Sequence, residues 1–320
     1  MLHMGHATSK TESYVEEAIR KLPNIGSMAQ HYEIVTAPAA SPIRRAVDAI
    51  GARVQSVQGD EWFIKAYYPD ALPLHNLDSV ADASEIAGDL GVAPRLIDRA
   101  PEHGVLAFEY LGEGWDWGRL DSLSSLSALK EQIELRRSIH DGPRFAVERD
   151  IFEEIASYVE HARRIGAPLP LDFDWLLASV EDAAKTLQKT REASVPAHGD
   201  GACSNIMVNQ KGELRLIDFD VSGNDDPIHD LAAMLVEVCS FKEDVWEGVK
   251  IWSGHYDLQL FSKCMLYGIA DDIRWGLWGL VLFQESPRQD VEFFKYGQWR
   301  LLRARMNIQD RDFELWCRSL

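Results

Sequence analysis

The 320-residue sequence has few cysteines, no long apolar run and no signal-peptide pattern. Its four cysteines are widely spaced and form no Cys-x-x-Cys pair, which disfavours a zinc site or a disulfide framework and fits a reducing cytoplasm. They are Cys203, Cys239, Cys264 and Cys317. The longest apolar stretch, WGLWGLVLF, has nine residues and cannot span a bilayer. Since the N-terminal residues contain no apolar core of signal-peptide length, we expect a cytoplasmic protein without membrane insertion.

Positive charge is also scarce in this chain. It has 33 Lys and Arg against 51 Asp and Glu, which gives a formal net charge of −18. Nucleic-acid phosphates would be repelled by such a surface, so the sequence argues against a nucleic-acid partner. The same charge suits a cationic small molecule, although it also serves as an ordinary solubilising surface. The composition leaves open whether two copies form a homodimer.

The pattern of apolar residues predicts a β-rich first part of the chain. Residues 32–38, 51–68 and 104–114 are rich in aromatic and β-branched residues, which is typical of strands. A Gln-Gly-Asp turn inside the second run predicts a hairpin. Residues 79–94 have helical spacing. This part therefore predicts a small antiparallel sheet with one helix laid on it.

After Gly114 the pattern becomes helical. Three long segments with helical spacing lie at 125–142, 150–166 and 172–193. The sequence thus predicts a two-lobed α+β protein, with a β-rich N-lobe over residues 1–110, a hinge near 109–114 and a mainly helical C-lobe over residues 111–320. The cleft between two such lobes is the expected ligand site.

The polar residues best suited to chemistry lie in one turn and in the strand pair after it. Within HGDGACSN, residues 198–205, Asp200 and Asn205 stand on a loop ahead of an expected strand. Asp218 ends the next expected strand, ELRLIDFD. A carboxylate and an amide oxygen in that arrangement suit Mg²⁺, and Asp200 would then face an incoming hydroxyl group.

This constellation, H-x-D-x-x-x-x-N followed by an apolar Asp-Phe, resembles the catalytic and metal loops of protein kinases and of their small-molecule relatives. The resemblance implies a two-lobed, protein-kinase-like fold. It implies that Asp200 is the catalytic aspartate, which orients the attacking hydroxyl, and that Asn205 and Asp218 bind the metal. Lys65, in EWFIKAY, matches the strand lysine that reaches the phosphates of ATP. A structural role is implied for His198.

The resemblance also implies how the nucleotide is held. In protein kinases the strand lysine pairs with a helix carboxylate, and here Asp82 and Glu85 compete for that role. Adenine would be held by backbone groups near Glu109 and Leu111. These four positions complete the expected nucleotide site.

One expected element is missing. Kinases carry a glycine-bearing loop over the phosphates, whereas this chain has TAPAASPIRRA at residues 36–46. Its run of Ala and Ser allows close backbone approach, and Arg44 or Arg45 would add positive charge. How this loop meets the phosphates stays open.

The last third of the chain carries a cluster of aromatic residues. On a helix, Asp271, Trp275 and Trp278 share one face, a spacing that ordinary core residues also show. WGLWG followed by EFFKYGQWR resembles the C-terminal region of choline/ethanolamine kinases, in which paired tryptophans and a downstream tyrosine line the choline pocket. The resemblance implies that Trp275, Trp278 and Tyr296 surround a quaternary ammonium and attract it by cation–π interaction.

The segment DPIHDLAAMLVE is similar to the same family. Asp230 is implied to brace the catalytic loop, and Glu237 is implied to face the substrate cation. The chain departs from the family after the metal-loop Asp-Phe, where choline kinases tend to carry Glu and an aromatic residue and this chain has Asp220 and Val221. A pocket with this departure would accept choline, another amino alcohol or a different compound.

Together these motifs predict an enzyme: an ATP- and Mg²⁺-dependent kinase that transfers the γ-phosphoryl group to the hydroxyl of a cationic amino alcohol such as choline or ethanolamine. Aminoglycoside phosphotransferases share the His-Gly-Asp and metal motifs, so a kinase of the same fold acting on an aminoglycoside or another metabolite is the alternative. A non-catalytic pseudokinase is a third hypothesis, and the presence of the motif aspartates, asparagine and lysine argues against it.

Overall fold

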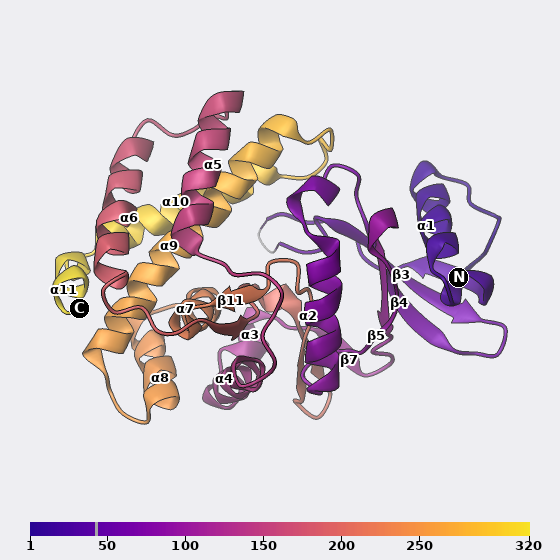
Figure 1. Ribbon diagram of the computed structural model, residues 1–320, viewed down its shortest axis with the longest axis horizontal. Coiled ribbons are helices and arrows are strands. Elements are labelled where there is room, and N and C mark those ends of the chain that lie inside the picture. The colour runs from indigo at the N-terminus through magenta and orange to yellow at the C-terminus, as the bar shows by residue number, and fades with distance from the viewer. Residues whose placement is uncertain (42–43) are drawn as a thin grey trace.

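The computed structural model describes residues 1–41 and 44–320 and has two lobes (Figure 1). The first lobe is built on a six-stranded antiparallel sheet in the order β1-β2-β3-β4-β6-β5. Its strands are β1 (Leu2–His3), β2 (Ala29–Ile34), β3 (Ala49–Ser56), β4 (Glu61–Tyr67), β5 (Leu96–Ala100) and β6 (Val105–Glu109). The predicted two-lobed α+β fold is therefore confirmed.

The two faces of this sheet pack against different helices, because successive side chains of a strand point to opposite faces. Ile64 of β4 belongs to the core formed with α1 (Lys10–Lys21). Tyr67, on the opposite face, packs in the core formed with α2 (Leu77–Asp89). Lys65 lies two residues before Tyr67, so it shares the face toward α2. Figure 1 shows α1 and α2 on opposite sides of the central strands.

Local sequence signals set the first helix and the central hairpin. Ser9 and Glu12 form a reciprocal capping box at the start of α1. The predicted turn between β3 and β4 is confirmed, with Gly59 at a φ of +93° that favours glycine.

The second lobe is mostly helical, with two small sheets in the orders β10-β9-β7 and β11-β8. The helices are α3 (Leu120–Leu123), α4 (Leu126–His140), α5 (Ile151–Ile165), α6 (Phe173–Leu187), α7 (Pro227–Val238), α8 (Lys242–Ser253), α9 (Leu258–Glu285), α10 (Phe293–Ile308) and α11 (Phe313–Arg318). The strands are β7 (Trp115–Trp117), β8 (Val195–Ala197), β9 (Ile206–Asn209), β10 (Leu214–Leu216) and β11 (Gly223–Asp225). The second lobe also contains the short 3-10 helix η4 (Cys203–Asn205), and the first lobe contains η1 (Ile25–Ser27), η2 (Leu72–Leu74) and η3 (Pro101–His103). Within the described ranges, none of the helices combines the length and the apolar character needed to cross a membrane.

Helices α9 and α10 approach closely where glycines face each other. A Cβ atom added to Gly279 would lie 2.8 Å from the backbone nitrogen of Gly297, and a Cβ on Gly297 would lie 2.8 Å from the carbonyl oxygen of Gly276. Larger residues would force the helices apart. The approach brings Tyr296 against Trp278, with ring centroids 5.7 Å apart.

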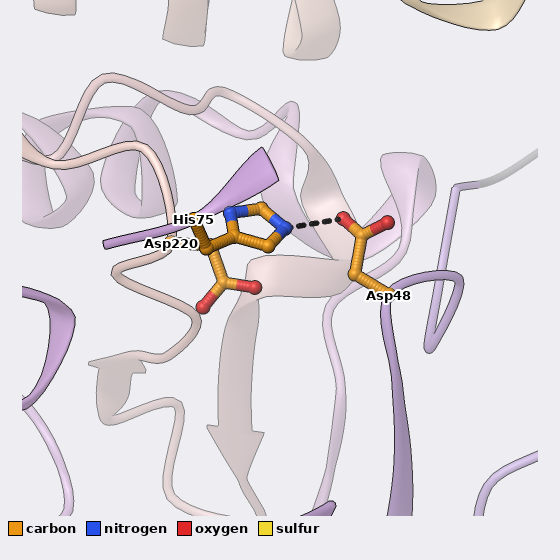
Figure 2. A group of neighbouring side chains, drawn as sticks. All are labelled: Asp48, His75 and Asp220. Carbon is orange, nitrogen blue, oxygen red and sulfur yellow. Dashed lines mark ion pairs between the residues drawn. The ribbon is translucent and has the colours of Figure 1, made fainter. Parts of the chain in front are cut away.

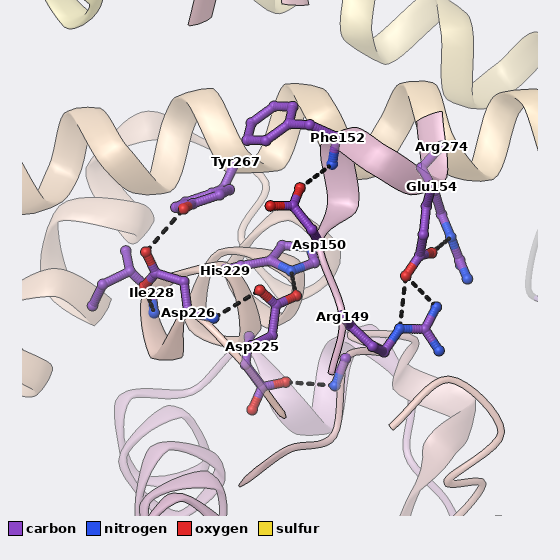
Figure 3. Close-up of polar contacts among 12 residues, drawn as sticks. Arg149, Asp150, Phe152, Glu154, Asp225, Asp226, Ile228, His229, Tyr267 and Arg274 are labelled. Atoms are coloured by element: carbon purple, nitrogen blue, oxygen red, sulfur yellow. Dashed lines mark hydrogen bonds and ion pairs between the residues drawn. The ribbon is translucent and has the colours of Figure 1, made fainter. Parts of the chain in front are cut away.

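Buried charges fix the start of α7 (Figure 3). His229 Nδ1 lies 2.7 Å from Asp225 Oδ2. Asp226 caps the helix through the Ile228 amide at 2.8 Å, and the Tyr267 hydroxyl of α9 donates to Asp226 at 2.9 Å. Burial alone would lower the pKa of His229, but Asp225 raises this pKa to about 9. A charged imidazole thus joins α7 to β11.

The sequence did not predict β5. This strand contains a buried acid, Asp98, which a strand prediction disfavours. The backbone amides of Asn24 and Ile25 donate to Asp98 at 2.8 and 2.9 Å, which stabilises the buried carboxylate. The lobe boundary expected between residues 110 and 111 stays a prediction; β6 ends at Glu109.

Candidate active site

The loop that carries Asp200 is held by groups from three surrounding elements. The His198 ring, fully buried, makes hydrogen bonds with the carbonyl oxygens of Asp200 at 3.0 Å and Ile217 at 2.9 Å. Asp230 of α7 accepts from the Gly199 amide at 2.9 Å. Arg136 of α4 donates to the Asp200 carbonyl at 3.0 Å. His198 and Asp230 thus both contact the loop of Asp200, and their expected structural roles stay a prediction.

The Asp200 carboxylate is buried and fully engaged. Its Oδ1 accepts from the Ala202 amide at 2.9 Å, and its Oδ2 accepts from Asn205 Nδ2 at 2.9 Å and from Arg44. Burial alone would raise the pKa of Asp200, but Arg44 and the Ala202 amide hold this pKa below its ordinary value. The group is therefore a carboxylate, able to orient a hydroxyl and take its proton.

Asn205 and Asp218, the expected metal ligands, lie on neighbouring segments. The Ile217 amide donates to the Asn205 carbonyl at 2.9 Å, which fixes η4 beside the end of β10. Asp218 has a φ of +69°, a left-handed conformation that Asp tolerates better than most residues. The backbone turns sharply here, and the Asp218 carboxylate meets Lys65 of β4.

Lys65 ion-pairs with two carboxylates of this loop. Its ammonium contacts Asp218 and lies 2.6 Å from Asp220, which also accepts from the Tyr67 hydroxyl at 2.5 Å. Burial alone would lower the pKa of Lys65, but the two aspartates hold it well above its ordinary value. Lys65 is thus a fixed positive charge beside the expected metal ligands.

The predicted pairing of Lys65 with Asp82 or Glu85 is wrong for this structure. Both carboxylates lie on the exposed face of α2, where Arg99 of β5 is 2.6 Å from Asp82 and 3.8 Å from Glu85. The helical repeat explains the difference, because the face of α2 toward the cleft carries Ser84 instead of an acid. The carboxylates that meet Lys65 come from the second lobe.

Asp220 belongs to a second polar group, drawn in Figure 2 with Asp48 and His75. His75 Nε2 lies 3.5 Å from Asp48 Oδ2, and one ligand atom from each of the three side chains lies within 4.8 Å of the others. Burial alone would lower the pKa of His75, but Asp220 and Asp48 raise it. His75 thus lies between Asp48, just before β3, and Asp220 of the metal loop.

A cavity of about 270 Å³ opens between the two lobes beside Lys65 and Asp218. It extends along the hinge, where Glu109 and Leu111 line it as expected for the adenine end. Other lining residues are Val35, Thr36, Phe63, Phe108, Tyr110, Trp115, Trp117, Asn205, Met207 and Phe219. The cavity has the shape of a cleft with apolar walls and polar groups at one end, as small-molecule sites have.

Thr36, Arg44, Arg45 and Ala46, from the two ends of the atypical 36–46 segment, line this cavity. Residues 42–43 of the segment fall outside the described ranges. Ala39 and Arg45 exchange two backbone hydrogen bonds, at 2.9 and 2.7 Å. Arg45 places its guanidinium 4.7 Å from the ring centroid of Trp117. Arg44 points instead toward Asp200.

Trp275, Trp278 and Tyr296 form one buried aromatic cluster, which we call the ring cluster. Neighbouring rings meet edge to face, with centroids 5.4 Å apart for Trp275 and Trp278. Their residues are only 2%, 2% and 5% exposed, so no open pocket lies between the rings. Leu277 and Leu280 of the same helix pack in the main core instead.

The guanidinium of Arg44 lies against the ring cluster. Its Cζ is 3.8 Å from the Trp275 centroid and 5.8 Å from that of Trp278, and the same group ion-pairs with Asp200. Burial alone would lower the pKa of Arg44, but Asp200 more than compensates and raises it. The structure therefore places a cation on the ring cluster beside the Asp200 carboxylate.

A second guanidinium approaches the same ring from a fixed position. Arg274 Cζ lies 3.9 Å from the Trp275 centroid. Its Nε donates to Glu154 of α5 at 3.0 Å, and Glu154 also pairs with Arg149 (Figure 3). Arg274 is therefore a structural neighbour of the ring cluster.

Glu237 pairs with arginines of α10 in this structure and not with Arg44. Its carboxylate pairs with Arg300 and, at 3.0 Å, with Arg303 of α10. These arginines hold the pKa of Glu237 below its ordinary value against the effect of burial. The carboxylate beside the rings is Asp200, and a substrate role for Glu237 stays a prediction.

Sequence reasoning missed two functional candidates, Asp220 and His75. Asp220 was noted only as a departure from a family pattern, although its spacing of two from Asp218 was available as a signal. His75 had no sequence signal, since only the fold brings it to the metal loop.

The chain belongs to the phosphotransferase enzyme family, whose model matches residues 44–255. This confirms the prediction of a phosphotransferase. The match ends before α9 and α10, so it does not include the ring cluster. No curated protein matches the sequence.

Solved structures with the same fold include choline and ethanolamine kinases, the family that the sequence resembles. A choline/ethanolamine kinase family protein from Mesorhizobium loti has a TM-score of 0.78 at 18% identity, covering 95% of this chain and 97% of that one. The choline kinase LicA from Streptococcus pneumoniae has a TM-score of 0.75 at 20% identity, covering 94% and 99%. The ethanolamine kinase from Plasmodium vivax has a TM-score of 0.74 at 16% identity, covering 98% and 92%. The protein is similar in fold to choline and ethanolamine kinases, as predicted.

Proposed function

We propose that this phosphotransferase is an ATP- and Mg²⁺-dependent kinase that acts on the hydroxyl of a small cationic amino alcohol such as choline or ethanolamine. The observation that carries the proposal is the guanidinium of Arg44, which rests on Trp275 and at the same time pairs with Asp200. A cation in the position of this guanidinium would hold its neighbouring atoms next to the Asp200 carboxylate. In a short amino alcohol the hydroxyl is close to the charged nitrogen, so the hydroxyl would lie beside Asp200.

The residues around Asp200 support a phosphoryl-transfer mechanism. Asp200 would orient the acceptor hydroxyl and accept its proton as the new bond from oxygen to the γ-phosphorus forms and the bond to the β-phosphate oxygen breaks. Because the transition state is loose, the proton moves late, and a carboxylate with a low pKa is a sufficient base. Asn205 holds the Asp200 carboxylate in position through its amide.

Charge neutralisation would fall to Lys65 and to the metal ligands. Asp218 and Asp220 offer carboxylate oxygens and Asn205 an amide oxygen, the donor types that Mg²⁺ prefers, so the residues present fit this metal. When bound, Mg²⁺ would neutralise charge on the phosphates. Lys65, with its raised pKa, stays protonated and would bind a phosphate oxygen.

The cavity beside Lys65 supports the nucleotide part of the proposal. The LicA choline kinase has been solved with AMP, and a spectinomycin phosphotransferase of similar fold, with a TM-score of 0.60, has been solved with ADP and its substrate. In this chain the hinge residues Glu109 to Leu111 line one end of the cleft. We infer that adenine binds there. The composition and fold also favour the cytoplasm as the place of action.

The test is an ADP-release assay with Mg-ATP and a panel of choline, ethanolamine, other amino alcohols, aminoglycosides and neutral sugars. We expect turnover confined to small cationic alcohols, because such compounds match the charge beside Asp200. Turnover of an aminoglycoside but of no small amino alcohol would replace the proposed substrate class. Silence over the whole panel, together with ATP binding in calorimetry, would support the pseudokinase hypothesis.

A further inference from the structure

We propose that Arg44 is a specificity-determining residue: its guanidinium occupies the acceptor position on the ring cluster as an internal cation, which an acceptor must replace. The inference rests on the proposed function in one respect, that the ring cluster is the acceptor site. The new element is that the Arg44 guanidinium competes with every acceptor for this site.

The contacts of Arg44 are those of a bound cation. Its guanidinium makes close contact with the Trp275 face and pairs with the Asp200 carboxylate, and the residue is 8% exposed. Its backbone is held as well, since the Ser204 hydroxyl donates to the Arg44 carbonyl at 2.5 Å. The cavity between the lobes is lined by Arg44 but by none of the three rings. Arg44 therefore separates the cavity from the ring cluster.

Arg44 is bound less firmly than a structural arginine of the same region. Arg300 pairs with three carboxylates, those of Glu237, Asp271 and Asp272. Across residues 1–41 and 44–320, Arg44 pairs with Asp200 alone. A guanidinium with one ion pair has less to lose on displacement than one with three.

Displacement of Arg44 has a different cost for different acceptors. A neutral alcohol that replaces it offers Asp200 a hydrogen bond but leaves the buried carboxylate without its positive partner, which is unfavourable. A cationic alcohol restores both the charge pairing and the cation–π contact. Arg44 thus disfavours neutral hydroxyl compounds more strongly than cationic ones, a form of selection against the wrong partner.

The test measures cation binding without catalysis. Tetramethylammonium, a quaternary cation with no hydroxyl, is titrated by calorimetry and tryptophan fluorescence into the wild-type protein, Arg44→Gln and Arg45→Gln. Arg45 is the matched control, because it is the next residue with the same charge but lies on Trp117. If Arg44 fills the site about nine-tenths of the time, its removal tightens tetramethylammonium binding by about tenfold or more. Arg45→Gln should bind the cation as the wild type does.

Three results separate this inference from the proposed function. Equal tetramethylammonium affinity in all three proteins would overturn the inference, even where amino alcohols are phosphorylated. Tighter binding in Arg44→Gln alone would support it, even where no member of the acceptor panel is turned over. Absence of binding in all three would overturn the ring cluster as a cation site and the inference with it.

A second variant guards against loss of folding in Arg44→Gln. Arg44→Ala leaves a gap shaped for a guanidinium, so methylguanidinium at millimolar concentration should raise its Tm. The wild type and Arg45→Ala, in which Arg44 is present, should show no such rise. A Tm of Arg44→Ala that does not respond would overturn the inference.

Discussion

The two sides of Asp200 are built differently. Toward the first lobe lies a cavity of about 270 Å³ with Lys65 at its polar end. Toward α9 and α10 lie rings that are at most 5% exposed, with the guanidinium of Arg44 against them. Under the proposed function, the nucleotide side is thus preformed, while the acceptor side is packed with groups of the protein itself. Catalysis would then require rearrangement on the acceptor side only.

The largest effect on turnover is expected at Asp200, which lies between the nucleotide side and the acceptor side. Asp200→Asn keeps the shape of the side chain but removes the base, so kcat should fall by about 100- to 10,000-fold. ATP affinity, which depends on the other side, should stay near that of the wild type in calorimetry. A variant with nearly normal turnover would contradict the role of Asp200.

The charged network of Figure 3 lies beside the acceptor side and includes His229. Because His229 titrates, the free energy of unfolding of the protein should depend on pH. The pKa of His229 is raised from 6.5 to about 9, so its contribution to the free energy of unfolding is fully present below pH 6.5 and is lost as pH rises through 9. The loss should be on the order of 3 kcal/mol. Chemical denaturation across this range measures it, and His229→Gln should remove most of the pH dependence.

Substitution in the ring cluster should change the KM for the cationic acceptor and not the KM for ATP. Trp278→Leu removes a cation–π partner and should raise the KM for a cationic acceptor by about 2- to 30-fold, with little change in the KM for ATP. Trp246→Leu is the matched control, because Trp246 stacks on Phe261 in the core near α8. Equal loss of affinity for both substrates in Trp278→Leu would mean that the ring is only part of the core.

The smallest effect is expected on α2. Asp82→Asn and Glu85→Gln remove carboxylates that pair with the exposed Arg99, so kcat and the KM for ATP should change by less than about twofold. Lys65→Met, on the same side of Asp200, is the contrasting variant and should weaken ATP use strongly. A large effect of Glu85→Gln would restore the helix-carboxylate pairing that the structure does not have.

Much of the site was predictable because its signal lies in short stretches of chain. His198 to Asn205 are separated by few residues, and a loop followed by a strand leaves little freedom in how Asp200 and Asn205 lie. The helical repeat likewise placed Trp275 and Trp278 on one face of α9. The sheet face of Lys65 followed from alternation along β4.

The errors concern partners far apart in sequence. Lys65 was expected beside α2, but Asp218 and Asp220, over 150 residues later, are closer in space. The expected place of Glu237 beside the substrate cation stays a prediction; its partner Arg300, on α10, was likewise not foreseen from the sequence. Charge pairs of this kind depend on how helices pack, and no local pattern encodes that.

The sequence by itself determined the chemical groups available to this protein: the aspartate of the His-Gly-Asp motif, oxygen groups of a type that binds Mg²⁺, a strand lysine and a pair of tryptophans. Local rules of helix, strand and turn are enough to position such groups within their own elements. Only the tertiary structure decided which charges meet. It placed Arg44 between the ring cluster and Asp200, because the ion pair and the ring contact together offset the cost of burying a guanidinium.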